Sequence, residues 1–568
     1  MTGVLAPLPV LLPLLGAAGT LLVGRHPAVQ RALSVTVIVA VLGVSVALLV
    51  RADDLGATAV SVGGWPVPLG VVLVVDRLSA LMLVVASAVA LGVLLFAVGQ
   101  GSADGSERTP LSVFHPTFLV LVAGVSNAFL AGDLFNLYVG FEILLMASYV
   151  LLTLGGTAPR IRGGITYVVV SLTSSLVFLA GIGLVYAATG TVNMAQLAVR
   201  LGELPEGTQL LLQSVLLIAF CIKAAVFPLS AWLPDSYPTA PAPVTAVFAG
   251  LLTKVGVYAI IRTQTLLFPG GALDGVLMWA ALATMLIGIL GAVAQTDIRR
   301  ILSFTLVSHI GYMVFGISLG TTAGLAGAIF YVAHHIAIQT TLFLVAGLVE
   351  RQGGSTAVDR LGGLAKASPV LAVLYFVPAM NLAGIPPFSG FIGKLGLLRA
   401  GVEVGTGPAL VLVAGGVVTS LLTLLAVSRV WTRAFWRPRS QEPGADTADA
   451  AAADAGPDGP EPATVPAGRA ADDGPTARQA ARSAAWARHT EVATAAHPGA
   501  EAAEESATGT GGRPLPRVMV ATTGAMVALT VALTGIAGPL YGLATRAAAD
   551  LQERTSYLDA VLGDGERS

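Results

Sequence analysis

Charged side chains are scarce in this chain of 568 residues, because Asp, Glu, Lys and Arg make up only 11% of it. A soluble globular domain carries roughly 25% of these residues. Hydrophobic residues make up 55% of the sequence, and its mean hydropathy is +0.81. The net charge of −1 provides no basic surface for nucleic acid. These values exclude a soluble protein and a nucleic-acid-binding protein, and they indicate a polytopic membrane protein.

Cysteine is almost absent, since Cys221 is the only one. A single cysteine excludes an intrachain disulfide and a cysteine metal cluster. The sequence has no glycine-rich phosphate loop between a strand and a helix, and no cysteines spaced for an iron–sulfur cluster. Its histidines are not accompanied by a convergent set of metal ligands. We therefore expect no nucleotide, redox or metal cofactor.

Lysine is also rare, because only 4 of the 31 basic residues are lysines. Lys223, Lys254 and Lys394 lie in apolar runs, and Lys366 lies in a loop. Arginine and lysine both supply positive charge, but only lysine can lose its proton at an accessible cost when it is desolvated. The bias predicts that these spans need a group that can deprotonate. The alternative is that each lysine lies near a helix end and extends its amine to the lipid headgroups.

Long apolar runs are what the sequence has in place of charge. A bilayer core of ~30 Å needs about 20 apolar residues per helix. The first run, at the N-terminus, is expected to be a membrane helix and not a cleaved signal peptide. The runs predict an all-α polytopic membrane protein with about fourteen transmembrane helices, centred near residues 14, 40, 86, 121, 144, 175, 218, 249, 284, 309, 335, 382, 422 and 528.

Two spans are interrupted by proline and glycine. Lys223 precedes the first break, and Lys394 follows the second. Non-helical backbone survives at membrane depth only where it is buried in protein or lines a wet cavity, and paired broken helices point to inverted repeats around a transport site. The residues that predict these discontinuous helices are Pro228, Pro234 and Pro238 in the first break and Gly384, Pro386 and Pro387 in the second.

The breaks and the change of composition near residue 438 predict the organisation of the chain. The segment at 438–515 is rich in Ala, Pro, Gly and Asp, so it cannot bury enough apolar surface to fold. A small folded domain is the alternative for this segment. We expect an N-terminal three-helix segment at 1–110, inverted five-helix repeats at 111–262 and 270–437, a disordered cytoplasmic insert at 438–515, and a last transmembrane helix with a tail at 516–568.

The distribution of basic residues predicts the orientation. Loops after odd-numbered spans hold ten of them: Arg25, Arg31, Arg108, Arg160, Arg162, Arg299, Arg300, Arg351, Arg360 and Lys366. Loops after even-numbered spans hold four: Arg51, Arg200, Arg262 and Arg399. By the positive-inside rule the first set is cytoplasmic and both termini are external. The connecting segments at 191–204 and 353–364 are expected to lie at the membrane interface.

Four further titratable residues lie in apolar runs. Glu142 is the only formal charge in its span, and such a carboxylate is costly unless it is paired, so Lys223 is its expected partner. The alternative is a protonated glutamate that is hydrogen-bonded to a serine. His309, His334 and His335 titrate near neutral pH, and His335 is favoured as functional, although packing is an alternative for each.

Four segments now identify a resemblance to a known family: "GDLFNLYVGFEILLMASYVLL", "FPLSAWLPDSYPTAPAPVTAVFAGLLTKVGVYAIIR", "DIRRILSFTLVSHIGYMVFGI" and "NLAGIPPFSGFIGKLGLL". They resemble the antiporter-like subunits shared by respiratory NADH dehydrogenase, membrane hydrogenases and Mrp antiporters. The resemblance covers about residues 1–437 and 515–565. Within it, "SRVWTRAFW" and "AADLQERTSYLDAVLG" are most similar to the D-type subunits of the Mrp sodium/proton antiporters.

The resemblance implies which residues form a proton path. Many relatives have a lysine at the position of Gln339, which can relay a hydrogen bond through water but cannot carry the charge. The residues that match the family's proton path are Glu142, Lys223, Lys254, His335 and Lys394, with His309 and His334 as weaker matches.

Together these features predict a proton-translocating subunit of a multisubunit antiporter that exchanges a monovalent cation, Na⁺, for H⁺. Its partners are expected to be the other subunits of that complex and the lipid bilayer of a bacterial plasma membrane. Such a subunit is a secondary transporter and not an enzyme. Two alternatives stay open: a membrane-arm subunit of a redox-driven pump, as in NADH:quinone oxidoreductase or a membrane hydrogenase, and a scaffold that transports nothing.

Overall fold

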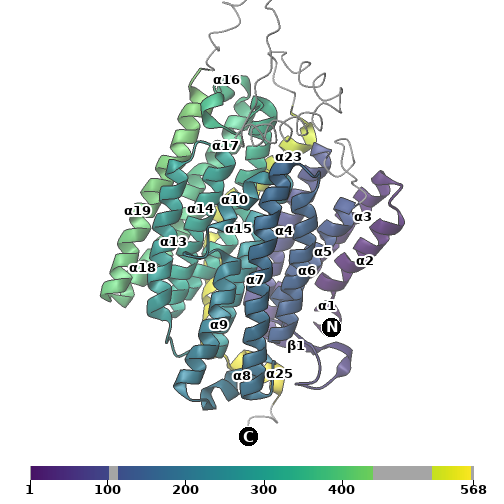
Figure 1. Cartoon of the computed structure of the whole chain (residues 1–568), viewed down its shortest axis with the longest axis vertical. Helices are drawn as coiled ribbons and strands as arrows, with labels where there is room; N and C mark the ends of the chain where they lie inside the picture. Colours follow the sequence, from purple (N-terminus) through teal and green to yellow (C-terminus); the bar gives the residue numbers. More distant parts are fainter. Residues whose placement is uncertain (1, 102–112, 439–514, 564–568) are drawn as a thin grey trace, which may run out of the picture. The chain divides into compact units, whose positions relative to one another are not determined.

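The computed structural model describes residues 2–101, 113–438 and 515–563 (Figure 1). In this part of the chain, twelve helices are long and apolar enough to cross a membrane. Two shorter apolar helices, Phe114–Leu130 and Pro369–Ala383, bring the total to the fourteen that the sequence predicts. The mainly helical membrane fold is confirmed. The predicted disordered insert at 438–515 lies almost entirely outside the described residues.

The N-terminal part contains a short β-hairpin that the all-α prediction omits. Its strands are antiparallel, and Thr58 pairs with Val75 and Ser61 with Val72. Strands of four residues give too short a pattern to be distinguished from the start of the next apolar helix. The elements of this part are α1 (Thr2–Leu5), α2 (Leu8–Leu22), α3 (Pro27–Leu55), β1 (Thr58–Ser61), η1 (Val62–Gly64), β2 (Val72–Val75) and α4 (Arg77–Gln100).

Two successive sets of helices follow. The first consists of α5 (Phe114–Leu130), α6 (Leu134–Thr153), α7 (Ala158–Thr189), α8 (Met194–Arg200), η3 (Leu201–Glu203), α9 (Glu206–Ala224), α10 (Trp232–Ser236), η4 (Tyr237–Thr239), α11 (Ala242–Val247), η5 (Phe248–Leu252), α12 (Thr253–Arg262) and η6 (Thr263–Leu267). The second consists of α13 (Asp274–Ala294), α14 (Ile298–Ser318), α15 (Thr322–Gly353), η7 (Val358–Arg360), α16 (Leu364–Ala367), α17 (Pro369–Ala383), α18 (Ser389–Val404), α19 (Gly407–Val430) and η8 (Trp431–Trp436).

The second set repeats the construction of the first at a fixed distance along the chain. α7 and α15 are both 32 residues long, and α15 begins and ends 164 residues after α7 (158 to 322, 189 to 353). Asp133 caps α6 and forms a β-bridge with Asn193, and Asp297, also 164 residues later, caps α14 and forms a β-bridge with Ala357. Figure 1 draws α8, after the first bridge, at the lower end and α16, after the second, at the upper end. The two helix sets thus recur at a constant interval, and the inverted five-helix repeats at 111–262 and 270–437 stay a prediction.

The first predicted break follows α9. Ala225 ends the helix with a left-handed backbone, φ 58°, directly after Lys223 and Ala224. Pro228 lies in the irregular turn that follows, and Pro234 and Pro238 lie in the short helical pieces α10 and η4. Lys223 therefore lies in the last turn of a helix, as the sequence predicts.

The second predicted break separates α17 from α18. Gly384 ends α17 with φ 85°, and Pro386 and Pro387 lie in the turn before α18. A Cβ on Gly384 would approach the Cδ of Lys394 to 2.9 Å. Glycine is thus required at position 384 for two reasons. The left-handed backbone disfavours a side chain, and the Lys394 side chain occupies the space that a Cβ would need.

The continuous helical segment Ala242–Leu267, which consists of α11, η5, α12 and η6 and carries Lys254, is wholly buried and packs against two neighbours. A Cβ on Gly256 would lie 2.7 Å from the backbone N of Ala224, so α12 crosses the end of α9 at close range. A Cβ on Gly250, in the π-helical turn η5, would lie 2.2 Å from the Oγ1 of Thr340 on α15. Small residues at both crossings let this segment lie in contact with α9 through α12 and with α15 through η5.

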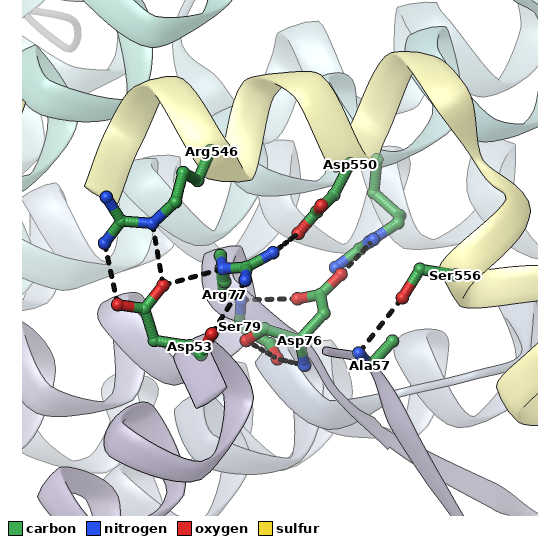
Figure 2. Close-up of polar contacts among 9 residues, drawn as sticks. Asp53, Ala57, Asp76, Arg77, Ser79, Arg546, Asp550 and Ser556 are labelled. Carbon is green, nitrogen blue, oxygen red and sulfur yellow. Dashed lines mark hydrogen bonds and ion pairs between the residues drawn. The ribbon is translucent and has the colours of Figure 1, made fainter. Parts of the chain in front are cut away.

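The chain ends with three helices, α23 (Arg517–Gly535), α24 (Ala537–Glu553) and α25 (Thr555–Leu562). Figure 2 shows α24 lying over the ends of α3 and α4. Arg546 pairs with Asp53 at 2.7 Å, and Asp550 pairs with Arg77 at 2.6 Å. The Oγ of Ser556, in α25, accepts a hydrogen bond from the backbone N of Ala57 at 3.1 Å. The predicted last span and amphipathic tail therefore fold back onto the N-terminal part.

Candidate proton path

The structure connects Glu142 and Lys223 through one hydroxyl group. The Oγ of Ser175, on α7, donates a hydrogen bond to the Oε1 of Glu142 and accepts one from the Nζ of Lys223 at 3.1 Å. The amine also lies 4.8 Å from the centre of the Phe141 ring. The expected direct ion pair is replaced by a serine-bridged contact, because α7 places the hydroxyl between the two groups. A hydroxyl that donates on one side and accepts on the other can pass a proton from the ammonium to the carboxylate.

A small cavity of about 20 Å³, measured as the space open to the centre of a water molecule, adjoins Lys223. Ser171 and Ser174 of α7 line it together with Tyr167 and Trp232. A water molecule needs about 10–15 Å³ by this measure, so the cavity has room for one water molecule near the amine.

Lys254 lies fully buried in α12 and has a poorer set of hydrogen-bond acceptors. Its Nζ donates to the backbone O of Ala249, in the π-helical turn η5, at 2.6 Å. An ammonium has three N–H donors, and among the described residues this carbonyl is the only acceptor within hydrogen-bond distance of Lys254. Lys254 is close enough to interact electrostatically with His335 on α15. The neutral amine therefore fits this position better than the ammonium does, unless water completes its hydrogen bonds.

Lys394 has the opposite environment. Its Nζ donates to the backbone O atoms of Leu382 and Ala383 at 3.0 and 2.9 Å and to the Oγ of Ser420 at 3.1 Å. These three acceptors match the three donors of an ammonium. The centre of the Tyr312 ring lies 5.2 Å away. The end of α17 thus solvates a positive charge on Lys394.

Two of the predicted histidines are held by hydroxyl groups. The Nδ1 of His309 lies 2.8 Å from the hydroxyl O of Tyr331, and its Nε2 lies 3.4 Å from the Oγ1 of Thr423. The Nδ1 of His334 lies 3.0 Å from the Oγ of Ser389, at the start of α18. A hydroxyl can donate to or accept from either tautomer, so both rings can change protonation state without losing a partner.

His335 lies beside His309, with ring centres 5.2 Å apart. Neither ring nitrogen of His335 has a hydrogen-bond partner within the described ranges, although the residue is fully buried. Gln339, one turn further along α15, donates to the backbone O of Leu302 at 2.7 Å, and its Oε1 has no partner there either. Buried polar atoms of this kind are usually satisfied by ordered water. The side chains of His335 and Gln339 are therefore suited to contact water inside the protein.

The predicted residues thus form two clusters. One consists of Glu142 and Lys223, and the other consists of the three histidines and Lys394. Lys254 lies on the helical segment Ala242–Leu267, which packs against both α9 and α15. In the part of the chain that the structure describes, no group of three or more His, Cys, Asp or Glu residues could hold a metal ion. The arrangement is one of titratable groups and hydroxyls that can exchange protons.

Sequence reasoning allowed a serine as the partner of Glu142 but did not identify Ser175, and it missed Tyr331, which bonds His309. The sequence pattern indicates Ser175 only as a polar residue on the same face of α7 as Ser171. Tyr331 cannot be distinguished by sequence from an aromatic residue of the core. It also missed a buried ion pair, because Arg262 was assigned to an external loop. Arg262 is instead the last residue of α12, and its Nη1 lies 2.7 Å from the Oδ2 of Asp76.

A Ser175→Ala variant is expected to exchange ions about tenfold to a hundredfold more slowly, because Glu142 and Lys223 lose their shared hydrogen-bond partner. The rate of Na⁺-driven proton movement in proteoliposomes measures this. Ser174→Ala is the matched control, since its hydroxyl bonds the backbone O of Ala219 and no titratable group. Equal rates in the two variants would contradict a relay through Ser175.

Comparisons with known proteins agree with this geometry. Residues 131–423 match the family described as "NADH:quinone oxidoreductase/Mrp antiporter, TM". The chain is 43% identical over 433 residues to the D-type Na⁺/H⁺ antiporter subunit of Alkalihalophilus pseudofirmus, and the match covers 76% of this chain and 86% of that protein. It is 36% identical to the protein of the same name from Bacillus subtilis, over 77% of this chain and 88% of that protein.

A comparison with solved structures also finds membrane proteins of similar fold. A chain in the structure of the Mrp complex from Dietzia sp. has a TM-score of 0.82 and 32% identity, covering 99% of this chain and 100% of that one. A chain of respiratory complex I from Thermus thermophilus has a TM-score of 0.70 at 23% identity, over 96% of this chain and 99% of that one. The second likeness is one of fold alone.

Proposed function

This chain belongs to the family of membrane subunits shared by NADH:quinone oxidoreductases and Mrp antiporters, and we propose that it carries the proton path of a multisubunit Na⁺/H⁺ antiporter. It is a transporter subunit and not an enzyme, and it works within a multisubunit complex in the membrane. The observation that carries the proposal is the serine bridge between Glu142 and Lys223, because it joins an acid and an amine through a group that can relay a proton.

The proposed path runs along the middle of the protein. A proton passes between Glu142 and Lys223 through Ser175, and Lys254 receives it through water on the α9–α12 contact. Buried water beside His335 then links Lys254 to the histidines, and Tyr312 separates their rings from Lys394. Lys254 favours the neutral form and Lys394 favours the charged form. The free energy therefore falls when a proton moves from Lys254 to Lys394.

The proposed orientation follows the distribution of basic residues. Both termini and the β-hairpin lie on the external side of a bacterial plasma membrane, and the loops that carry Arg299, Arg300 and Lys366 lie on the cytoplasmic side. Sodium crosses the membrane in partner subunits or at their interface with this chain, because the described path holds a single carboxylate, Glu142, among amines and imidazoles.

A sodium gradient tests the proposed function directly. Proteoliposomes that hold the whole complex and a pH-sensitive dye are expected to become alkaline inside when Na⁺ is added outside, because inward Na⁺ drives protons out. The response requires neither NADH nor quinone. Empty liposomes and liposomes of the complex without this chain are the controls.

The redox-driven alternative predicts the opposite result. A membrane-arm subunit of a quinone-linked pump would show no response to the Na⁺ step, and NADH with quinone would drive proton movement instead. Copurification of flavin and iron–sulfur subunits with this chain would also contradict the proposed function.

A further inference from the structure

The recurrence of the two helix sets allows two aspartates in the same structural position to be compared. Asp133 and Asp297 each cap the helix that follows and accept the backbone N–H three residues ahead, at 2.6 Å from Asn136 and 3.0 Å from Arg300. Each also lies in the same local backbone arrangement. Leu134 N donates to Val192 O at 2.9 Å, and Ile298 N donates to Thr356 O at 2.9 Å.

The two aspartates differ in the partner of their second carboxylate oxygen. The Oδ2 of Asp297 accepts a hydrogen bond from the Oγ1 of Thr356. Val192 stands 164 residues before Thr356 and has a methyl group where threonine has its hydroxyl (192 to 356). The Oδ2 of Asp133 accordingly has no partner among the described residues, although the residue is only 6% exposed. Asp133 thus has a buried carboxylate oxygen without a hydrogen-bond partner, whereas the corresponding oxygen of Asp297 has one.

The surroundings of Asp133 favour its protonated form. Burial raises the pKa of the Asp133 carboxyl to about 6, against the opposite effect of the backbone N–H groups of Asn136, Val72 and Phe135. No cation contributes to that value. A carboxyl in such a site therefore binds a proton at a pH close to neutrality.

The other titratable groups at this end of the bundle are fixed by one another. Tyr557, from α25, lies near enough to Asp133 to interact with it electrostatically, and it faces Arg262, which pairs with Asp76. Tyr258 accepts a hydrogen bond from Arg262 at 3.1 Å. On the helix that Asp133 itself caps, Tyr138 follows one turn later and Glu142 one turn after that. Asp133 is the carboxyl of this group that is left without a fixed partner for one oxygen.

Buried polar groups continue inward from Asp133. The Nδ2 of Asn127, near the end of α5, donates to the Oδ1 of Asn136 at 3.0 Å. Two residues further along α5, the backbone O of Phe129 accepts from the hydroxyl of Tyr258 at 2.7 Å. Tyr258 is one turn from Lys254 on the same face of α12. Polar side chains therefore extend from Asp133 toward the lysine in the middle of the protein.

We propose that Asp133 is a further proton-binding site of the transport reaction, where the chain takes up protons from the outer face before they reach Lys254. This inference rests on the proposed function and on the orientation given there. The site suits a metal cation less well, because the unpartnered side-chain atoms of Asn136, three residues on, and of Asn193, the β-bridge partner of Asp133, are Nδ2 donors. A proton requires only the open oxygen of Asp133.

The test is to give Asp133 the partner that Asp297 already has. In proteoliposomes that contain the whole complex, Na⁺-linked proton uptake is measured while the pH of the outer face alone is varied. The wild-type chain is expected to be half-saturated with protons near pH 6. Val192→Thr supplies a donor to the charged carboxylate, so the half-saturating pH is expected to fall by about one unit while the maximal rate is unchanged. Asp133→Asn is expected to lower the rate at least tenfold and remove this pH dependence.

Three controls isolate the effect. Val192→Ala adds no hydroxyl and is expected to leave the half-saturating pH at its wild-type value. Thr356→Val and Asp297→Asn make the corresponding changes at the opposite end of the bundle and are expected to leave it unchanged as well. Copurification of the partner subunits establishes that each variant is assembled.

The outcomes separate this inference from the proposed function. An unchanged half-saturating pH in Val192→Thr, or an equal shift in Thr356→Val, would overturn the role of Asp133. If Lys223→Ala abolishes exchange in the same preparation, the proposed function stands although the role of Asp133 does not. If Lys223→Ala and Asp133→Asn both exchange ions normally, both proposals fail.

Discussion

A Lys223→Ala variant is expected to lose at least about a hundredfold of the Na⁺-driven proton movement, because positioned proton-transfer groups contribute 10²–10⁴-fold to the reactions they serve. The variant removes the amine that donates to the Ser175 hydroxyl, so the hydroxyl still bonds Glu142 but no longer joins it to a group that can supply a proton. Alanine is smaller than lysine, so the truncated side chain fits the site without a clash. We therefore expect a complex that assembles and does not transport.

Lys223→Arg distinguishes proton transfer from charge. It keeps the positive charge near Glu142, but an arginine stays protonated at every accessible pH. A relay that requires release of the proton fails in Lys223→Arg as completely as in Lys223→Ala, whereas a purely electrostatic role is preserved. Exchange at the wild-type rate in Lys223→Arg would contradict proton transfer through Lys223.

The measurement is the initial rate of dye alkalinisation after a Na⁺ step, normalised to the amount of assembled complex. Lys366→Ala is the matched control, because Lys366 lies in the short helix α16 on a loop and has no contact with the path. Its rate is expected to equal the wild-type rate. A scaffold without transport activity would give equal rates in all three variants.

The sequence was sufficient to predict the spans and the breaks, because both have strong local causes. Apolar runs of membrane length can only be helices, and proline and glycine mark where a helix cannot continue. The bias toward arginine drew attention to Lys223, Lys254 and Lys394, and the structure buries all three. Their roles stay predictions, whereas their positions at helix breaks and crossings are observed.

The contacts between these residues could not be predicted from the sequence. Ser175 is one of several serines in α7, and only the packing of α6, α7 and α9 shows which one bridges Glu142 and Lys223. The difference between Lys254 and Lys394 is also invisible in the sequence, because backbone carbonyls supply their acceptors. Backbone acceptors depend on where a helix is broken in three dimensions and not on residue type.

Arg262 illustrates the limit of a charge rule. The positive-inside rule counts basic residues in loops, so an arginine at the end of an apolar run is assigned to solvent. In the structure Asp76, a residue from 186 positions earlier (76 to 262), neutralises it, and Tyr557 covers it from the opposite end of the sequence. Such long-range pairing leaves no local signal.

Arg262→Met is expected to destabilise the outer end of the bundle by about 3–5 kcal/mol, because removing one partner leaves Asp76 as an uncompensated buried charge. The two side chains are 2% and 9% exposed, so water cannot replace the lost guanidinium. The ring of Tyr557 lies 5.1 Å from the guanidinium carbon and loses that contact as well. The helix α25 should therefore detach while the path around Lys223 keeps its structure.

Hydrogen exchange at the backbone amides of α25 measures this detachment, because local opening follows the stability of the contacts that hold a segment. Arg546→Met is the matched control: its pair with Asp53 is 49% and 32% exposed, and exposed pairs contribute about 0–1 kcal/mol. The double variant Asp76→Leu/Arg262→Met should recover most of the protection, since it removes both charges together. Protection lost equally in Arg546→Met and Arg262→Met would contradict the buried pair as the main attachment.

The pH dependence of the same attachment has a definite sign. Burial alone would raise the pKa of Asp76, but the Arg262 guanidinium outweighs it and holds that pKa below its usual value. A lowered pKa in the folded state means that the pair contributes fully above about pH 4, the pKa of an unfolded aspartate, and loses its contribution as the pH falls through the lowered value. The contribution of this pair to the protection of α25 should therefore stay constant from neutral pH down to about pH 4 in the wild-type chain. In the double variant, which lacks the pair, the further loss at lower pH should be smaller, and equal losses would assign the acid sensitivity to groups other than Asp76.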